Sequence, residues 1–432
     1  MNLRLAAVDM RPRTVGGGLV TFTLILGLLI APIAGVLIAY IALAITLAAT
    51  IYLFAIRQPE VWSIETMGVV FAAGFTLLAM CFAISARAPG DLLFALNFLT
   101  FLLYVPLFSL LTRAASPTAT DAVAWLAFAG TLLGACYSVG EVWITGADRA
   151  GWLMPQNDPI RVANTTLLLG FFCLIGLRRH NNGLRLWLWA GPALGLAATI
   201  ACGSRTAMVA FAVLLFWVVL WFVQGWKRRA QICAALGLAL TVAVAVGINV
   251  SDRLDSLILS IHEILTNAPL TDPSMDIRMS LYRAATEAFG DAPVFGHGWA
   301  GMMRAIEPHL PAIHADQASL PHLHNEILNF ALAAGIVGVM VLAAILATPM
   351  ILALRSTSDS QKTARIYGCS ILILGYLVLG TADTMLSYET HTSLFVIWTA
   401  ILLGFCRDRP NTGDEPADLD SFTPKPSFRP QP

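Results

Sequence analysis

The sequence predicts an all-α membrane protein with many transmembrane helices. Of its 432 residues, 57% are hydrophobic and only 12% are charged, with a mean hydropathy of +0.74. A soluble core cannot hold this many apolar side chains. Apolar runs near the roughly 20 residues that cross the hydrocarbon layer recur throughout, so we expect about twelve spans in a transmembrane domain over residues 1–406.

The expected spans follow one another with short, polar connections. The first two are separated only by Ala31-Pro32, so a tight hairpin is expected at that dipeptide. The other runs are separated by charge, proline or glycine. The spans are predicted at residues 17–31, 33–56, 67–84, 92–111, 122–144, 160–177, 184–201, 206–223, 230–250, 325–354, 364–383 and 393–405.

Lysine and arginine gather in alternate connections, which predicts the orientation. If the amino terminus is cytoplasmic, every dense basic loop lies on the cytoplasmic side, as the positive-inside bias requires. Both termini are then cytoplasmic, and the first run is a retained span because it lacks a cleavage site followed by a polar segment. Residues 407–432 are rich in Pro, Asp and Ser and predict a disordered cytoplasmic tail.

One outer connection is far longer than the others. Residues 251–323 are more polar, and six of the eight histidines lie in this loop or just beyond it. Long loops of this kind tend to be functional. Helical spacing predicts a helix from Asp276 to Phe289, with Arg278 in its first turn. There the helix dipole disfavours a cation unless Asp276 or a bound anion offsets it. Tyr282 shares the face of Arg278, whereas Arg283 is rotated away.

Two further features lie at the predicted outer water-membrane boundary. His324 and Asn325 end the polar loop where the next apolar helix begins, and histidine is the side chain best suited to exchange a proton near neutral pH. Arg205 lies in the very short link Cys202-Gly-Ser-Arg-Thr206. A guanidinium fixed there can bind phosphate through two parallel hydrogen bonds.

Structural alternatives exist for each of these residues. Arg205 could extend to the interface, Arg278 could pair with Asp276 in solvent, and His324 could cap its helix. His309, His314 and His322 are more typical of a loop surface. A zinc site is a further alternative, but the HExxH pattern is absent. The seven cysteines contain no CxxC pair and predict neither a metal site nor a disulfide framework.

Taken together, the motifs between residues 200 and 340 resemble the O-antigen ligase and O-antigen polymerase superfamily. They are the Gly-Ser-Arg link, Arg278-x3-Tyr-Arg-Ala-Ala, Pro-Val-Phe-Gly-His-Gly at 293–298, His324-Asn325 and Gly-Ile-Val-Gly at 335–338. The resemblance implies a GT-C-like fold in the bacterial inner membrane. It also implies transfer of a glycan from a polyprenyl diphosphate carrier to an acceptor hydroxyl at the periplasmic face, without metal or other cofactor.

By that resemblance, His324 activates the acceptor and Arg205 and Arg278 hold the diphosphate. Asn325, Tyr282, Arg283 and His322 are possible supporting residues. Direct displacement at the anomeric carbon would invert its configuration.

The acceptor stays open at this stage. A ligase of lipopolysaccharide biosynthesis uses lipid A-core, a polymerase uses a carrier-linked repeat unit, and protein-glycosylating relatives use Ser or Thr. We favour ligation. A transporter or lipid flippase is the alternative from another class, but it predicts charges in the middle of spans and internal repeats, whereas this sequence has few such charges and no clear repeat. The expected partners are the lipid-linked donor, the acceptor and membrane lipid, and no nucleic acid.

Overall fold

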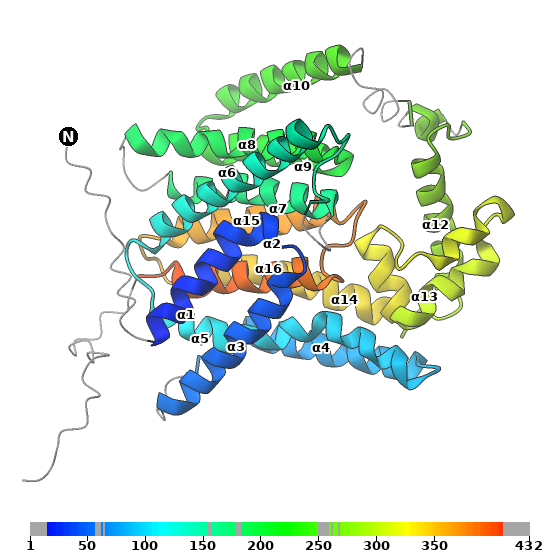
Figure 1. Cartoon of the computed structure of the whole chain (residues 1–432), viewed down its shortest axis with the longest axis horizontal. Coiled ribbons are helices and arrows are strands. Elements are labelled where there is room, and N and C mark those ends of the chain that lie inside the picture. Colours follow the sequence, from blue (N-terminus) through cyan, green and yellow to red (C-terminus); the bar gives the residue numbers. More distant parts are fainter. Residues whose placement is uncertain are drawn as a thin grey trace, which may run out of the picture.

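The computed structural model is all helical (Figure 1). It describes residues 15–56, 62–63, 65–153, 158–177, 183–248, 259–260, 262–266 and 268–408, and contains no strand within them. The predicted tail lies almost entirely outside these residues. The helices are α1 (Val15–Leu24), α2 (Ala31–Ala34), α3 (Leu37–Ile56), α4 (Thr66–Ser85), α5 (Tyr104–Arg113), α6 (Ala119–Thr145), α7 (Pro159–Phe172), α8 (Ala190–Cys202), α9 (Arg205–Phe222), α10 (Trp226–Ile248), α12 (Pro273–Phe289), α13 (Trp299–Ile306), α14 (Glu326–Arg355), α15 (Lys362–Leu379) and α16 (Glu389–Ala400).

Shorter turns of other helix types extend several of these helices. The π-helix η1 (Ile25–Ile30) joins α1 to α2, and η8 (Ile401–Phe405) continues α16. The remaining elements are 3-10 helices: η3 (Pro89–Leu103), η4 (Cys173–Gly176), η5 (Gly183–Trp189), η6 (Glu307–His309) and η7 (Ala312–Ser319).

Ten of the described helical segments are long and apolar enough to cross a membrane, and a shorter apolar one covers Glu389–Phe405. All eleven coincide with predicted spans. The remaining prediction, residues 230–250, falls on α10 and ends outside the described residues. The chain is therefore a polytopic membrane protein, as expected, and its orientation in the membrane stays a prediction.

The first hairpin was predicted at Ala31-Pro32, and this position was wrong. The helix continues through Ala31 and Pro32, because the π-helix Ile25–Ile30 leads into them and the proline occupies the first turn of α2, where its missing N–H is tolerated. The chain turns instead at Gly35, whose φ is +53°. A glycine adopts this conformation without steric penalty.

The core is built around α7, the most buried span, which packs against α6, α8, α9 and α15. A second set of contacts joins α4 to η3 and α14. Phe71 of α4 stacks on Phe101 of η3, which also contacts Phe98 in a tilted arrangement. Figure 1 shows α12 and α13 gathered at one end of the bundle, beside α14. The predicted outer loop therefore folds onto the helix that follows it.

The predicted helix of this loop exists, but it begins earlier than expected. It runs from Pro273 to Phe289, because Asp272 caps it by accepting hydrogen bonds from the N–H groups of Ser274 and Met275. Arg278 is therefore the sixth residue of α12, beyond its first turn. The dipole effect expected for Arg278 is correspondingly smaller, since it falls off within the first turn.

Candidate active site at one end of the bundle

The residues predicted from sequence come from three elements that meet at this end. Arg205 is the first residue of α9, Arg278 and Tyr282 lie in α12, and His324 precedes Asn325, the N-cap of α14. The Tyr282 hydroxyl donates a hydrogen bond of 2.9 Å to the carbonyl oxygen of His324. This bond joins α12 directly to the start of α14.

His324 is held in a backbone conformation that residues other than glycine rarely adopt. Its φ is +54°, the only positive φ at a non-glycine residue in the described part of the chain. Its N–H donates to Nδ1 of His322 at 3.1 Å, while its carbonyl oxygen accepts from Tyr282. Such a conformation costs of order 1–3 kcal/mol and persists where surrounding contacts enforce it, often at functional sites.

The surroundings of His324 favour its neutral form. Burial, and then the positive charge of Arg278, lower its pKa to about 4, while Asp158 acts in the opposite direction. The imidazole is therefore neutral at neutral pH, as a general base must be. Its Nδ1 is buried and has no hydrogen-bond partner among the described residues.

His322 fixes the position of His324. It is 5% exposed, and its ring centroid lies 4.2 Å from that of His324. Its Nδ1 accepts the His324 N–H and lies 3.2 Å from the hydroxyl of Thr384. Because that hydroxyl itself accepts from Nδ2 of Asn329, its proton can be donated to His322. Burial lowers the pKa of His322 to about 3. The network therefore assigns a neutral ring with its proton on Nε2.

The two predicted arginines are placed differently. Arg278 is half-buried, no hydrogen bond or ion pair joins it to other described residues, and its charge acts on His324. Arg205 instead donates from Nη1 to Oδ2 of Asp272 at 2.8 Å. It is connected to the His324 group through α12, not by direct contact. Asp276, the expected partner of Arg278, lies 2.8 Å from Nε2 of His314.

The remaining supporting residues have distinct positions. Oδ1 of Asn325 accepts from the Leu328 N–H at 3.0 Å, and its Nδ2 donates to the Thr381 carbonyl at 3.0 Å. Asn325 therefore fixes the start of α14. Arg283 is exposed, as its rotation on α12 predicts.

Comparison with known proteins identifies the family of this region. Residues 190–343 match a family model described as O-antigen ligase. Residues 190–343 are therefore similar to the O-antigen ligase family, and we refer to them as the O-antigen ligase domain. A chain from a solved peptidoglycan synthase complex that coordinates polymerization and crosslinking is also similar, with 19% identity and a TM-score of 0.47 over 79% of this chain and 97% of that one. No curated protein matches.

All seven predicted site residues lie inside the O-antigen ligase domain, but four of their neighbours lie outside it. The Arg161 guanidinium carbon lies 4.6 Å from the centroid of the Tyr388 ring, which meets His322 edge-on at 5.2 Å. Asp383 is 8% exposed, and burial raises its pKa to about 7. Asp158, the N-cap of α7, acts on His324.

Sequence reasoning missed these four residues because none belongs to a recognisable motif. Asp383 was also assigned to the span 364–383, whereas α15 ends at Leu379. The available signal was the polar stretch that follows α15, between two apolar runs.

Glu326 holds that polar stretch, residues 380–388, against the O-antigen ligase domain. It is the first residue of α14 and only 4% exposed. Its carboxylate accepts from the N–H groups of Met385 and Leu386 and from the Ser387 hydroxyl. Its own N–H donates to the Gly380 carbonyl at 2.8 Å. The segment carrying Asp383 and Tyr388 is thus built on the residue two positions after His324.

The Pro-Val-Phe-Gly-His-Gly turn at 293–298 docks into a break in α14. Ala334 and Gly335 leave helical geometry there. The N–H groups of His297 and Gly298 donate to the carbonyls of Leu332 and Ala333, and those of Ile336 and Val337 donate to Pro293 and Val294. The two glycine-rich motifs therefore form one backbone interface.

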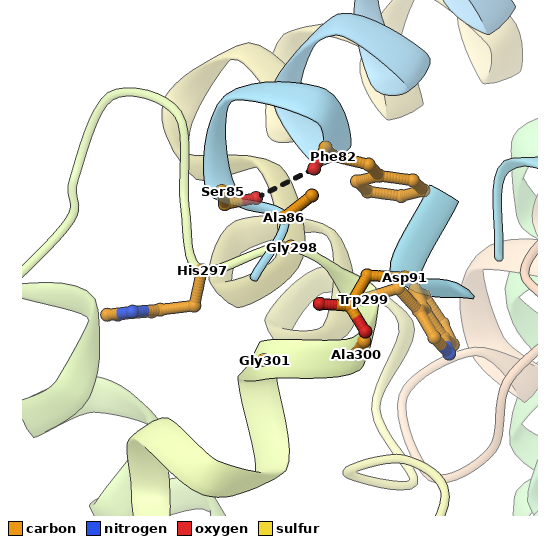
Figure 2. A pocket seen from close by; sticks show the side chains of 9 residues that line it. All are labelled: Phe82, Ser85, Ala86, Asp91, His297, Gly298, Trp299, Ala300 and Gly301. Atoms are coloured by element: carbon orange, nitrogen blue, oxygen red, sulfur yellow. Dashed lines mark hydrogen bonds between the residues drawn. The ribbon is translucent and has the colours of Figure 1, made fainter. Parts of the chain in front are cut away.

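Figure 2 shows a small hollow beside this turn, bordered by Phe82, Ser85, Asp91 and Trp299, with the His297 side chain pointing away from it. It has essentially no space that a water molecule could occupy, whereas typical ligand sites hold roughly 300–1,000 Å³. We therefore do not assign the hollow to substrate. No group of His, Cys, Asp and Glu suited to a metal ion occurs among the described residues.

Proposed function

We propose that this chain transfers a glycan from a polyprenyl diphosphate carrier to an acceptor sugar hydroxyl at the periplasmic face of the bacterial inner membrane. Ligation of O-antigen to lipid A-core is the preferred reaction, because the matching family model is that of O-antigen ligases. The observation that carries the proposal is the neutral imidazole of His324 beside the guanidinium of Arg278 within that domain.

His324 acts as the general base in this proposal. As the acceptor oxygen bonds to the anomeric carbon, its proton passes to the imidazole. The bond from that carbon to the diphosphate oxygen breaks, and its electron pair stays on the diphosphate. This direct displacement inverts the anomeric configuration. A positioned base typically contributes roughly 10² to 10⁴-fold to the rate.

Arg278 and Arg205 stabilise the leaving diphosphate. Arg278 has no ionic partner among the described residues, and Arg205 uses only Nη1 to bind Asp272, so further N–H groups of both can bind phosphate oxygens. A bound diphosphate also offsets the charge of Arg278 near His324, which raises the pKa of His324. The base therefore becomes stronger once the donor is bound. We expect no requirement for a divalent metal, since guanidinium groups supply the positive charge.

The test uses the purified full-length protein in lipid nanodiscs with an undecaprenyl diphosphate-linked glycan. Lipid A-core and a carrier-linked repeat unit are offered as rival acceptors, with EDTA present. We expect transfer to lipid A-core, its loss in His324→Ala and Arg278→Ala, and its retention in Arg304→Ala, an arginine outside the proposed site whose Nη2 lies 3.9 Å from Oδ2 of Asp91. Transfer only to the repeat unit would make the protein a polymerase. Full activity of His324→Ala would refute the catalytic assignment, and a requirement for metal would refute the arginine clamp.

A further inference from the structure

The two carboxylate oxygens of Asp272 have different hydrogen-bond partners. Oδ1 accepts hydrogen bonds of 2.9 and 3.1 Å from the N–H groups of Ser274 and Met275, which caps α12. Oδ2 accepts from Nη1 of Arg205 at 2.8 Å. Although burial alone would raise its pKa, the bonds from Arg205 and the two amides hold the pKa of Asp272 below its ordinary value. The pair is therefore ionised at neutral pH.

The backbone that carries Arg205 is fixed to the transmembrane helices. Ser204 caps α9 by accepting from the Ala207 N–H, and its own N–H donates to the Thr199 carbonyl in α8. The carbonyl of Cys202 accepts from Nε of Arg149 at 2.9 Å. Because this link is anchored on the α8 side and on the 146–153 connection, the main freedom left to Arg205 is the direction of its side chain. Asp272 determines that direction.

The middle of α12 is fixed to the proposed base. Arg278 lies six residues after Asp272, roughly 9 Å along the helix axis at about 1.5 Å per residue. Tyr282, one turn further, donates to the His324 carbonyl. Arg278 therefore lies between two attachments of α12, one to Arg205 at the start of the helix and one to His324 at Tyr282.

We infer that Asp272 is a positioning residue that sets the spacing and direction of the Arg205 and Arg278 guanidinium groups for the two phosphates of the lipid-linked donor. This inference rests on the proposed function. The ion pair uses a single nitrogen of Arg205, so it orients the guanidinium while leaving other N–H groups for phosphate. The opposite role is also testable: a carboxylate that competes with phosphate for Arg205 would weaken donor binding.

The two roles predict opposite effects of Asp272→Asn. Asparagine caps a helix about as well as aspartate, so this change keeps the cap and removes the ionic bond. With the full-length protein in nanodiscs, we expect the donor KM and the inhibition constant of undecaprenyl diphosphate to rise on the order of 10-fold or more, as misplaced binding groups commonly cause. The acceptor KM should stay unchanged. Glu287→Gln is the matched control, because it removes the same charge from the same helix at an exposed position.

Arg205→Gln breaks the same pair from the other side and leaves the cap of α12 intact. If Asp272 acts through Arg205, adding Asp272→Asn to Arg205→Gln changes undecaprenyl diphosphate binding no further. The inference is overturned if Asp272→Asn binds undecaprenyl diphosphate more tightly than, or as tightly as, the wild-type protein. It is also overturned if Asp272→Asn weakens this binding equally in the wild-type protein and in Arg205→Gln. Arg278→Ala tests the proposed diphosphate site separately from the role of Asp272. If Arg278→Ala leaves undecaprenyl diphosphate binding intact, the proposed diphosphate site is wrong. If Arg278→Ala weakens binding and Asp272→Asn does not, only the role of Asp272 is overturned.

Discussion

Replacing Gly335 by alanine should separate the turn at 293–298 from α14 and displace the end of that helix that follows His324. Gly335 has φ +63° and ψ −153°, a conformation essentially restricted to glycine. A Cβ at this position would lie 2.3 Å from both the carbonyl carbon and the oxygen of Val294. These are backbone atoms, so no side-chain rotation can relieve the contact.

The size of the effect follows from two contributions. The strained backbone costs about 1–3 kcal/mol. Moving the turn away also weakens the hydrogen bonds from Ile336 to Pro293 and from Val337 to Val294, at about 0.5–1.5 kcal/mol each. We therefore expect the folded state to lose about 2–6 kcal/mol, combining the two estimates. Residues 326–333, which follow His324, would lose their outer support, so glycan transfer should fall together with stability.

The assay compares thermal unfolding in detergent and glycan transfer in nanodiscs for Gly335→Ala and Gly301→Ala. Gly301 lies in α13 of the same outer segment, and a Cβ there meets only the His297 side chain at an ordinary 3.6 Å. Gly296→Ala should reproduce the defect from the other side of the interface, since its Cβ would lie 2.5 Å from Ala333 backbone atoms. The double variant should be less than additive, because either change already separates the two backbones. Equal unfolding temperatures and activities for Gly335→Ala and Gly301→Ala would refute this account.

Three further predictions concern the site itself. Tyr282→Phe removes the hydroxyl that binds the His324 carbonyl. Because the proposed base is then misplaced, kcat should fall by roughly 10-fold or more, while the donor KM stays the same. An unchanged kcat would show that Tyr282 does not position His324. Glu326→Gln should lower both the unfolding temperature and the rate of glycan transfer, because an amide cannot accept all the hydrogen bonds that residues 380–388 donate to the carboxylate. Wild-type values in both measurements would show that Glu326 does not hold this segment in place. The base form of His324 exists above its pKa and is lost as pH falls through it, so kcat/KM for donor should be flat near neutrality and fall toward pH values of about 4. Arg278→Gln removes a positive charge, so the pKa of His324, followed by NMR titration of its imidazole, should rise, and an unchanged pKa would contradict this electrostatic effect.

The fold class and most spans could be predicted because they depend on local properties. A transmembrane helix needs only length and apolar composition, and both are readable in sequence. The helix at Arg278 was predictable in the same way, from the spacing of its apolar residues. Its start was misplaced because Asp272, which caps the helix, is also held by a bond to Arg205 in a distant helix, and helical spacing does not report that bond.

The site was predictable only where a residue belonged to a motif. His324, Arg278 and Arg205 lie in short sequence patterns, so their types and spacing were recognisable. Asp383 and Tyr388 lie near His324 only because Glu326 binds their segment across the fold. A contact of this kind depends on tertiary packing, which a single sequence does not report.

The position of His324, the proposed base, depends on three other parts of the structure. Tyr282 in α12 binds its carbonyl, Glu326 holds residues 380–388 beside it, and the turn at 293–298 closes the break in α14 behind it. The break needs Gly335, since backbone atoms of the turn occupy the space of a side chain. The two glycine motifs and the histidine motif are therefore parts of one physical arrangement. A change at any of the three supports should lower transfer through the geometry of His324, even though none of them touches the reacting atoms.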